Sequence, residues 1–386
     1  SGNAAGASSP GNDDVYHWDV VSPRAGATWK VNQSGRTVVK GYYGLLYRGI
    51  FLNDFTAAIP SITPKYIFDI TPSGARTNFN VVSSASNLTI DHGYNDPYSH
   101  QAVVQVEQEL MRNLGLQVNY VYKKGYDYPG WQDIRGQYAQ VPYVDSAGID
   151  AKGSTVMVYR LLTPFSQSIF QMTNVAGLYS KYNGVTITGT KRMSNHWQGT
   201  LSLVLSKSEG REASSTQGPA SAQSGTSGGF GRVGCGSACQ GGQNDFVNTD
   251  GLLIGDRPVV TKAQVIYRLP WDFLISGNLQ HQTGRPWARQ VRVRGLGFPA
   301  NPTIYMEPLD GSRRVPSLNL IDARIQKSFP LGKPGFLLDL FLDALNLTNN
   351  DTTENVLSRR GDVTTFGNPA RYIYPRRLQL GARIKF

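Results

Sequence analysis

The last ten residues of the chain, 377–386, alternate strictly between polar and apolar side chains. The apolar members are Leu378, Leu380, Ala382, Ile384 and Phe386. A side-chain period of two predicts a β-strand with one apolar face. An amphipathic edge strand of a soluble sheet would show the same alternation. This segment alone therefore leaves a soluble and a membrane setting open.

The composition favours a large β-structure with many turns. Of the 386 residues, 40% are hydrophobic and 17% charged, and there are 42 glycines and 20 tyrosines. No apolar run is long enough for a transmembrane helix, which needs about 20 residues. Strands that cross an outer membrane need only about 9–11 residues each, so a membrane protein is not excluded. Residues 1–10 lack the features of a signal peptide, and for an exported protein this predicts processing or truncation.

Two features that could indicate binding sites receive other interpretations. The net charge of +11 comes from Lys and Arg residues spread singly along the chain, so no nucleic-acid partner is expected. Cys235 and Cys239 lie in a glycine-rich run without a nearby histidine and supply only half of a closed zinc site. They predict a local disulfide formed in an oxidising compartment.

Predicted strands come in pairs around short turns centred near residues 34, 113, 195, 271 and 332. Long polar excursions separate the pairs, residues 65–70 are a candidate extra strand, and residues 1–18 are expected to form an extracellular loop. Short turns at one end and long loops at the other are typical of outer-membrane barrels, whose short turns are periplasmic. The predicted strands are 24–31, 37–48, 101–110, 116–124, 184–192, 198–206, 262–269, 273–282, 320–329, 336–347 and 377–386.

Each predicted strand has one apolar and one polar face. Trp197, Trp271, Phe273 and Phe329 lie at or beside the short turns, as expected for an aromatic girdle at a membrane interface. Charges in a dry interior cost several kcal/mol each unless paired, so the polar faces predict a wide, wet lumen. The candidate lumen-facing residues are Lys40, Arg48, Asn119, Arg192, Lys262, Gln280, Arg324, Asp339, Asp343 and Arg383.

The sequence contains none of the common catalytic or nucleotide-binding motifs. Its five histidines are scattered among unrelated segments. Asp339 and Asp343 share a strand face and are expected to pair with Arg324 or Arg383 rather than to act as an acid/base pair. The chain is therefore predicted to have no catalytic site, no metal site and no cofactor.

Several short segments together resemble TonB-dependent outer-membrane receptors, especially the Oar-like group. They are 22–26 (SPRAG), 35–47 (GRTVVKGYYGLLY), 182–185 (YNGV), 191–194 (KRMS), 269–271 (LPW), 284–287 (GRPW), 343–349 (DALNLTN) and 375–381 (PRRLQLG). The resemblance implies an all-β fold in the bacterial outer membrane, a 22-stranded barrel with a plugged lumen. The roughly eleven strands predicted here correspond to the C-terminal half of such a barrel.

The resemblance also implies partners. Residues 19–386 would form a partial barrel in contact with outer-membrane lipid, and the terminal Phe386 would be the signal read by the barrel-assembly machinery. No segment resembles the family's N-terminal plug, so the TonB complex would be reached only through a plug that is not in this chain. An odd strand count with an unpaired edge in lipid further predicts that the chain is part of a longer barrel.

Two functions follow from these expectations. The first is the barrel portion of a receptor that takes up a nutrient. The second is a structural or adhesion barrel that binds partners through its loops without transport.

Overall fold

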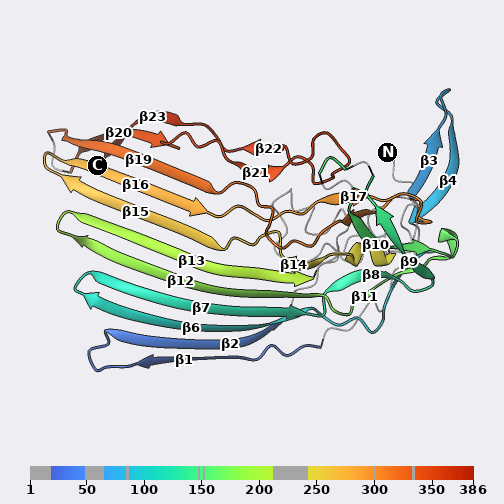
Figure 1. The fold of residues 1–386 in the computed structure, drawn as a ribbon. Helices are drawn as coiled ribbons and strands as arrows, with labels where there is room; N and C mark the ends of the chain where they lie inside the picture. Colours follow the sequence, from blue (N-terminus) through green and yellow to red (C-terminus); the bar gives the residue numbers. More distant parts are fainter. Residues whose placement is uncertain are drawn as a thin grey trace, which may run out of the picture.

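The fold, seen in a computed structural model, is dominated by one antiparallel sheet of eleven consecutive neighbours (Figure 1). The structure describes residues 19–47, 65–83, 87–146, 148–150, 153–211, 242–299, 301–332 and 335–386. All eleven predicted strands are present, with ends shifted by up to five residues. They are β1 (Arg24–Lys30), β2 (Thr37–Tyr47), β6 (Tyr98–Met111), β7 (Leu114–Tyr126), β12 (Tyr179–Ser194), β13 (Trp197–Arg211), β15 (Val259–Leu269), β16 (Phe273–Gln282), β19 (Leu318–Pro330), β20 (Leu337–Leu345) and β23 (Arg377–Lys385).

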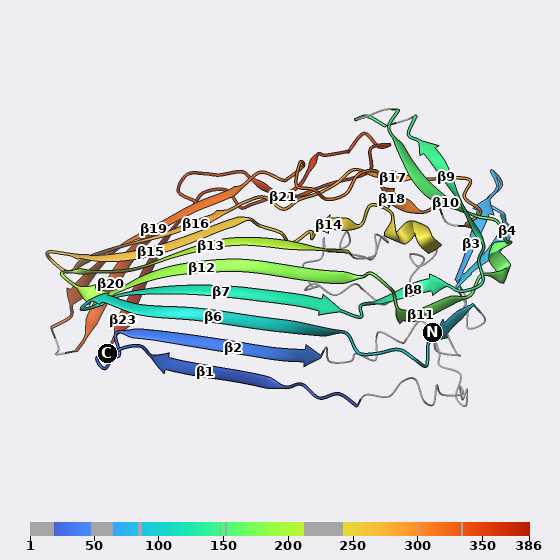
Figure 2. The same ribbon diagram turned by 60° about the horizontal axis from the view of Figure 1, so that its bottom comes forward.

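The sheet curves, and its connections differ at the two ends (Figures 1 and 2). Tight turns join the strands at the end where the C-terminus lies, and long connections leave the other end. Two of the tight turns, Asn195-His196 and Trp271-Asp272, have positive φ at both residues. This conformation matches the right-handed twist of the flanking strands and closes a two-residue hairpin. The predicted asymmetry of short and long connections is confirmed.

The strand register separates apolar from polar side chains. Val39, Val106, Val118, Ile187 and Leu203 lie opposite one another across five neighbouring strands. Side chains on this face are not covered by protein: Leu201, for example, is 54% exposed and Val265 is 47% exposed. Such a wide exposed apolar surface is the opposite of a soluble sandwich, in which the apolar face packs inward.

The sheet is open in the part of the chain that the structure describes. β1 pairs only with β2, and β23 pairs only with β20. Within the described residues, no helix is long and apolar enough to cross a membrane.

The long connections are not simple loops, because they contain short strands. The predicted strand at 65–70 is confirmed as β3 (Lys65–Ile70), which forms a hairpin with β4 (Arg76–Ser83). The other short strands were not predicted, and neither was the 3-10 helix η5 (Gly242–Phe246), which lies in the connection that follows β13. The unpredicted strands are β5 (Leu88–Ile90), β8 (Pro129–Asp133), β9 (Tyr138–Val144), β10 (Thr155–Leu161), β11 (Phe170–Asn174), β14 (Asp250–Leu252), β17 (Gln290–Arg292), β18 (Thr303–Tyr305), β21 (Thr353–Val356) and β22 (Pro369–Tyr372).

Four of the long connections pack into one unit, here called the loop cap: the described residues of 138–161, 242–256, 284–315 and 353–366. Its largest core cluster joins three of these connections around Val158, Val293 and Ile304, none of which is exposed. Backbone hydrogen bonds from Gly361 to Gln290 and from Ile149 to Gly361 attach the fourth. Connections far apart in the sequence therefore share one apolar core beyond the main sheet.

The Asn244 side chain links η5 to β10 through two hydrogen bonds. Its side-chain oxygen accepts a hydrogen bond from the Tyr159 N–H, and its side-chain nitrogen donates to the Tyr159 carbonyl, both at 2.7 Å. The asparagine is fully buried and replaces the strand neighbour that this part of β10 lacks. An unsatisfied buried backbone group costs about 1–3 kcal/mol.

We therefore predict that Asn244→Ala lowers the stability of the loop cap by about 2–4 kcal/mol. Amide hydrogen exchange of β10 would report the loss as faster exchange at residues 156–160. Gln243→Ala, at the exposed neighbouring position, is the matched control. Equal exchange in the two variants would contradict the role assigned to Asn244.

Candidate functional site

The face opposite the apolar one carries a continuous polar surface. Glu107, Gln117, Thr188, Ser202, Lys262 and Gln280 lie directly opposite one another across six neighbouring strands, from β6 to β16. The row arises because each strand alternates in phase with its neighbours, which a register slip of one residue would destroy. Hydroxyl, amide and charged groups are thus presented together on one side of the sheet.

Ion pairs link this polar face across strands. The Lys40 ammonium lies 2.6 Å from the Glu107 carboxylate, and the Arg324 guanidinium binds both carboxylate oxygens of Asp343, at 2.5 and 2.7 Å. Bidentate pairs of this kind are the strongest and most directional ion pairs.

Asp339 is the most buried acid of the polar face, with no exposed surface. Its carboxylate accepts a hydrogen bond from Ser328 at 2.6 Å and lies 3.1 Å from Arg383 and 2.7 Å from Lys385. The pairing of Asp343 with Arg324 and of Asp339 with Arg383 is the one expected from the sequence. These contacts tie the last strand to β20 and β19.

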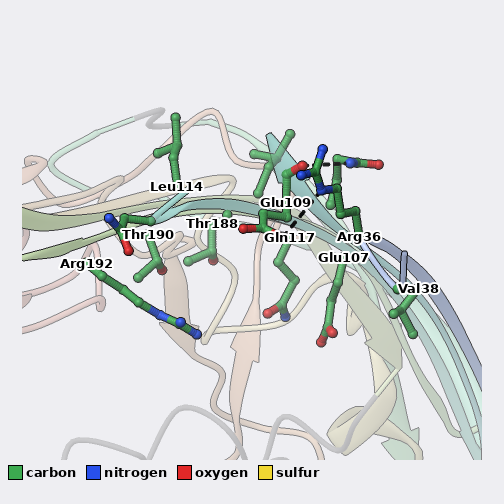
Figure 3. A pocket seen from close by; sticks show the side chains of 14 residues that line it. Arg36, Val38, Glu107, Glu109, Leu114, Gln117, Thr188, Thr190 and Arg192 are labelled. Atoms are coloured by element: carbon green, nitrogen blue, oxygen red, sulfur yellow. Dashed lines mark hydrogen bonds and ion pairs between the residues drawn. The ribbon is translucent and has the colours of Figure 1, made fainter. Parts of the chain in front are cut away.

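A pocket of about 420 Å³ lies on this face near the tight turns. Figure 3 shows Glu107, Gln117 and Arg192 extending to the same side of the sheet, while Leu114 points away. Arg36 lies 4.0 Å from Glu109 at the rim, and Thr188 and Thr190 add hydroxyl groups. The pocket offers both charged and neutral hydrogen-bonding groups. This mixture suits contact with a polar protein surface or with water rather than catalysis.

The tight-turn end of the apolar face has the aromatic residues expected of an interface. Trp271 is 80% exposed. The Lys191 ammonium lies 4.3 Å from the centroid of the Trp197 ring, and the Lys327 ammonium lies 4.6 Å from that of Phe273. Amphipathic rings beside lysines are typical of the boundary between hydrocarbon and headgroups.

The loop cap contains buried charged and polar side chains that contact one another. Arg289 and Asp145 form an ion pair in which each side chain is only 1% exposed, and Arg289 also donates to Ser154 at 3.1 Å. Burial raises the pKa of Tyr138, and its hydrogen bond to Asp133 raises it further, so the phenol remains a donor. These contacts are all made within the protein, although the Arg289 Nε atom is buried without a hydrogen-bond partner among the described residues, and we assign the groups structural roles.

The structure locates most of the predicted site residues on one face. Register with the polar row places Lys40, Asn119, Arg192, Lys262, Gln280, Arg324, Asp339, Asp343 and Arg383 on the polar side of the sheet. Arg48, the pair Cys235 and Cys239, and residues 1–18 lie outside the described residues. Phe386 is 93% exposed, and its ring centroid is 6.3 Å from that of Phe336.

Two groups were missed at the sequence level. Glu107 could have been found, because it alternates with Val104 and Val106 in the same strand. The Arg289–Asp145 pair could not, because its partners are 144 residues apart and neither belongs to a motif. Among the described residues, no group of three or more His, Cys, Asp or Glu side chains could hold a metal ion.

Comparison with known proteins agrees with this architecture. Residues 3–282, more than half of the chain, match the family described as "Outer membrane beta barrel domain". No curated protein sequence matches the chain.

Among solved structures, the outer membrane transporter YddB from Escherichia coli is 15% identical with a TM-score of 0.53, covering 95% of this chain and 40% of YddB. The siderophore receptor PiuA from Acinetobacter baumannii is 11% identical with a TM-score of 0.49, covering 94% of this chain and 35% of PiuA. At such identities the likeness concerns the fold alone, and this chain spans well under half the length of either protein. The family match, the eleven-stranded sheet and its two contrasting faces together show that the chain belongs to the outer-membrane β-barrel domain family and resides in the bacterial outer membrane.

Proposed function

We propose that this chain is the barrel portion of a TonB-dependent outer-membrane receptor of the Oar-like group that takes up a nutrient. The observation that carries the proposal is the polar surface that crosses six neighbouring strands. Charged and amide side chains on this scale are not tolerated in a narrow, dry barrel. In a wide barrel they contact water or a plug and form the wall of a passage.

Lipid, the assembly machinery and the energy-coupling system are the proposed partners. The apolar face would meet outer-membrane lipid, with the tight turns in the periplasm. Contact with the TonB complex is assigned to a plug domain and to no residue of this chain. Additional strands would pair with β1 and β23, because unpaired backbone groups in hydrocarbon cost several kcal/mol each. Cys235 and Cys239 are proposed to form a disulfide in the extracellular loop between β13 and β15.

A growth experiment tests transport. Deletion of the gene should impair growth on at least one nutrient supplied at limiting concentration, and inactivation of TonB should cause the same defect without adding to it. Restoring the intact gene should rescue growth only when TonB is active. If the intact gene improved growth by the same amount with and without active TonB, active uptake would be contradicted.

An adhesion or structural role is the alternative, favoured by the loop cap. The cap is a folded unit with its own apolar core, which is the kind of surface that binds a partner. In that case the deletion would abolish binding to a surface or to other cells while growth on every limiting nutrient remained unchanged.

Phe386 provides a separate prediction about assembly. Its side chain is 93% exposed, so replacing it should change the stability of the folded sheet by less than about 0.5 kcal/mol. Phe386→Ala should nevertheless reduce the amount of protein that reaches the outer membrane, measured as the heat-modifiable band in membrane fractions. Phe336→Ala is the control for the ring contact. Normal amounts of Phe386→Ala protein in the membrane would refute a recognition role.

A further inference from the structure

A basic and aromatic cluster lies on the apolar face at the end of the sheet from which the long connections leave. Lys124 of β7 and Lys181 of β12 are direct cross-strand partners, and Lys181 lies opposite Glu209 of β13. Since Val118 and Tyr120 share the face of Lys124, these lysines project to the same side as the apolar row. Like charges directly opposite each other on one face of a sheet are destabilising unless an anion lies between them.

Among the described residues, the ion pairs of these lysines involve a single carboxylate. Glu209 lies 3.0 Å from Lys181 and is also paired with Lys207, so one carboxylate serves two ammonium groups. Lys124 forms no ion pair with the described residues. Its ammonium lies 4.9 Å from the centroid of the Tyr126 ring, an attractive contact that leaves the charge uncompensated.

Tyrosines and a histidine border the lysines. Tyr98 stacks on Tyr126 at 5.4 Å between ring centroids, and the Tyr43 hydroxyl forms a 2.6 Å hydrogen bond with His100, the residue opposite Lys124. Rings with one polar end on a lipid-facing surface are typical of the headgroup level of a membrane.

The position of Lys124 along β7 agrees with the headgroup level of the membrane. Leu114, at the tight turn, and Lys124 are ten residues apart on β7, about 33 Å along the strand. A strand tilted by about 40° covers about 25 Å of membrane thickness over this length, the height of the apolar band of an outer-membrane barrel. With the tight turns in the periplasm, Lys124 and Lys181 lie at the outer leaflet.

We infer that Lys124 and Lys181, with Lys207 beside them, bind the phosphate groups of lipopolysaccharide in the outer leaflet. The inference rests on the proposed membrane orientation, but it does not depend on transport. Lys124 and Lys181 occupy directly opposite positions on neighbouring strands, so a phosphate bound between their side chains would remove their mutual repulsion. The neighbouring tyrosine rings would pack against the sugar and the upper part of the acyl chains.

The test is native mass spectrometry of the protein purified from outer membranes and stripped of lipid. We expect it to bind lipid A carrying both phosphates and to bind the same lipid without phosphates about tenfold more weakly or not at all. The double variant Lys124→Ser/Lys181→Ser should lose about tenfold in affinity for the phosphorylated lipid while keeping its heat-modifiable band. The matched control Lys30→Ser/Lys123→Ser removes the same charge from the opposite face of the sheet.

Four results would overturn the inference. They are equal binding of the two lipids, an equal loss of affinity in the control variant, undiminished binding by the Lys124 and Lys181 variant, and displacement of the lipid by inorganic phosphate at millimolar concentration. The last result would indicate a simple anion site. Growth on limiting nutrient is a separate measurement, so failure of lipid binding and failure of transport are distinguishable.

Discussion

Asp145→Ala is expected to destabilise the loop cap by about 3–5 kcal/mol, because it leaves the Arg289 guanidinium buried without its counter-ion. Both side chains of this pair are 1% exposed, so water cannot replace the lost carboxylate. The remaining hydrogen bond, from Arg289 to Ser154, does not neutralise the charge. Amide exchange in β9, β10 and β17 should therefore accelerate, and proteases should cleave the cap, while the main sheet remains intact.

Two comparison variants make this expectation specific. Asp150→Ala removes an acid from Arg313, but both partners are partly exposed and Arg313 keeps Glu307 at 2.8 Å, so the cost should stay below about 1 kcal/mol. The double variant Asp145→Leu/Arg289→Met also removes the buried, unpaired guanidinium charge and should recover most of the stability. A loss in Asp150→Ala as large as that in Asp145→Ala would contradict the assignment.

Leu203→Arg is expected to cost about 2–4 kcal/mol, because it places a charge near the middle of the apolar face. Leu203 lies opposite Ile187 on β12 and is separated from both ends of β13 by several residues. The measurement is reversible unfolding by guanidinium in lipid vesicles. An arginine in hydrocarbon must either stay unpaired or draw water into the bilayer, and each is unfavourable.

The neighbouring position gives the matched control. Ser202 belongs to the polar row between Thr188 and Lys262, so Ser202→Arg should cost less than about 1 kcal/mol. Similar losses for the two variants would mean that the two faces of β13 meet the same environment.

The main sheet was predictable because its information is local. Most of the long strands show a period of two over nine or more residues. Each tight turn contains residues that favour its backbone conformation. Gly35, in the turn near residue 34, has φ 67°, a conformation that glycine adopts without steric cost. Even the pairing of Asp343 with Arg324 followed from the face that each residue occupies on neighbouring strands.

The loop cap was not predictable for the opposite reason. β14, β17 and β18 have three residues each, too few to show any period. The core of the cap depends on contacts between segments more than a hundred residues apart, such as Val158 with Val293 and Asp145 with Arg289. The sequence suggested polar excursions because each segment alone buries little, and only their association creates a core.

Site-directed spin labelling of β13 in lipid bilayers tests the central claim, that one face of the sheet meets lipid and the other lines a wet interior. Labels at residues 200–205 should alternate, with oxygen reaching positions 201, 203 and 205 and a water-soluble nickel reagent reaching 200, 202 and 204. The alternation follows from the register of β13 with β12 and β15. Equal access of either reagent to all six positions would contradict the account.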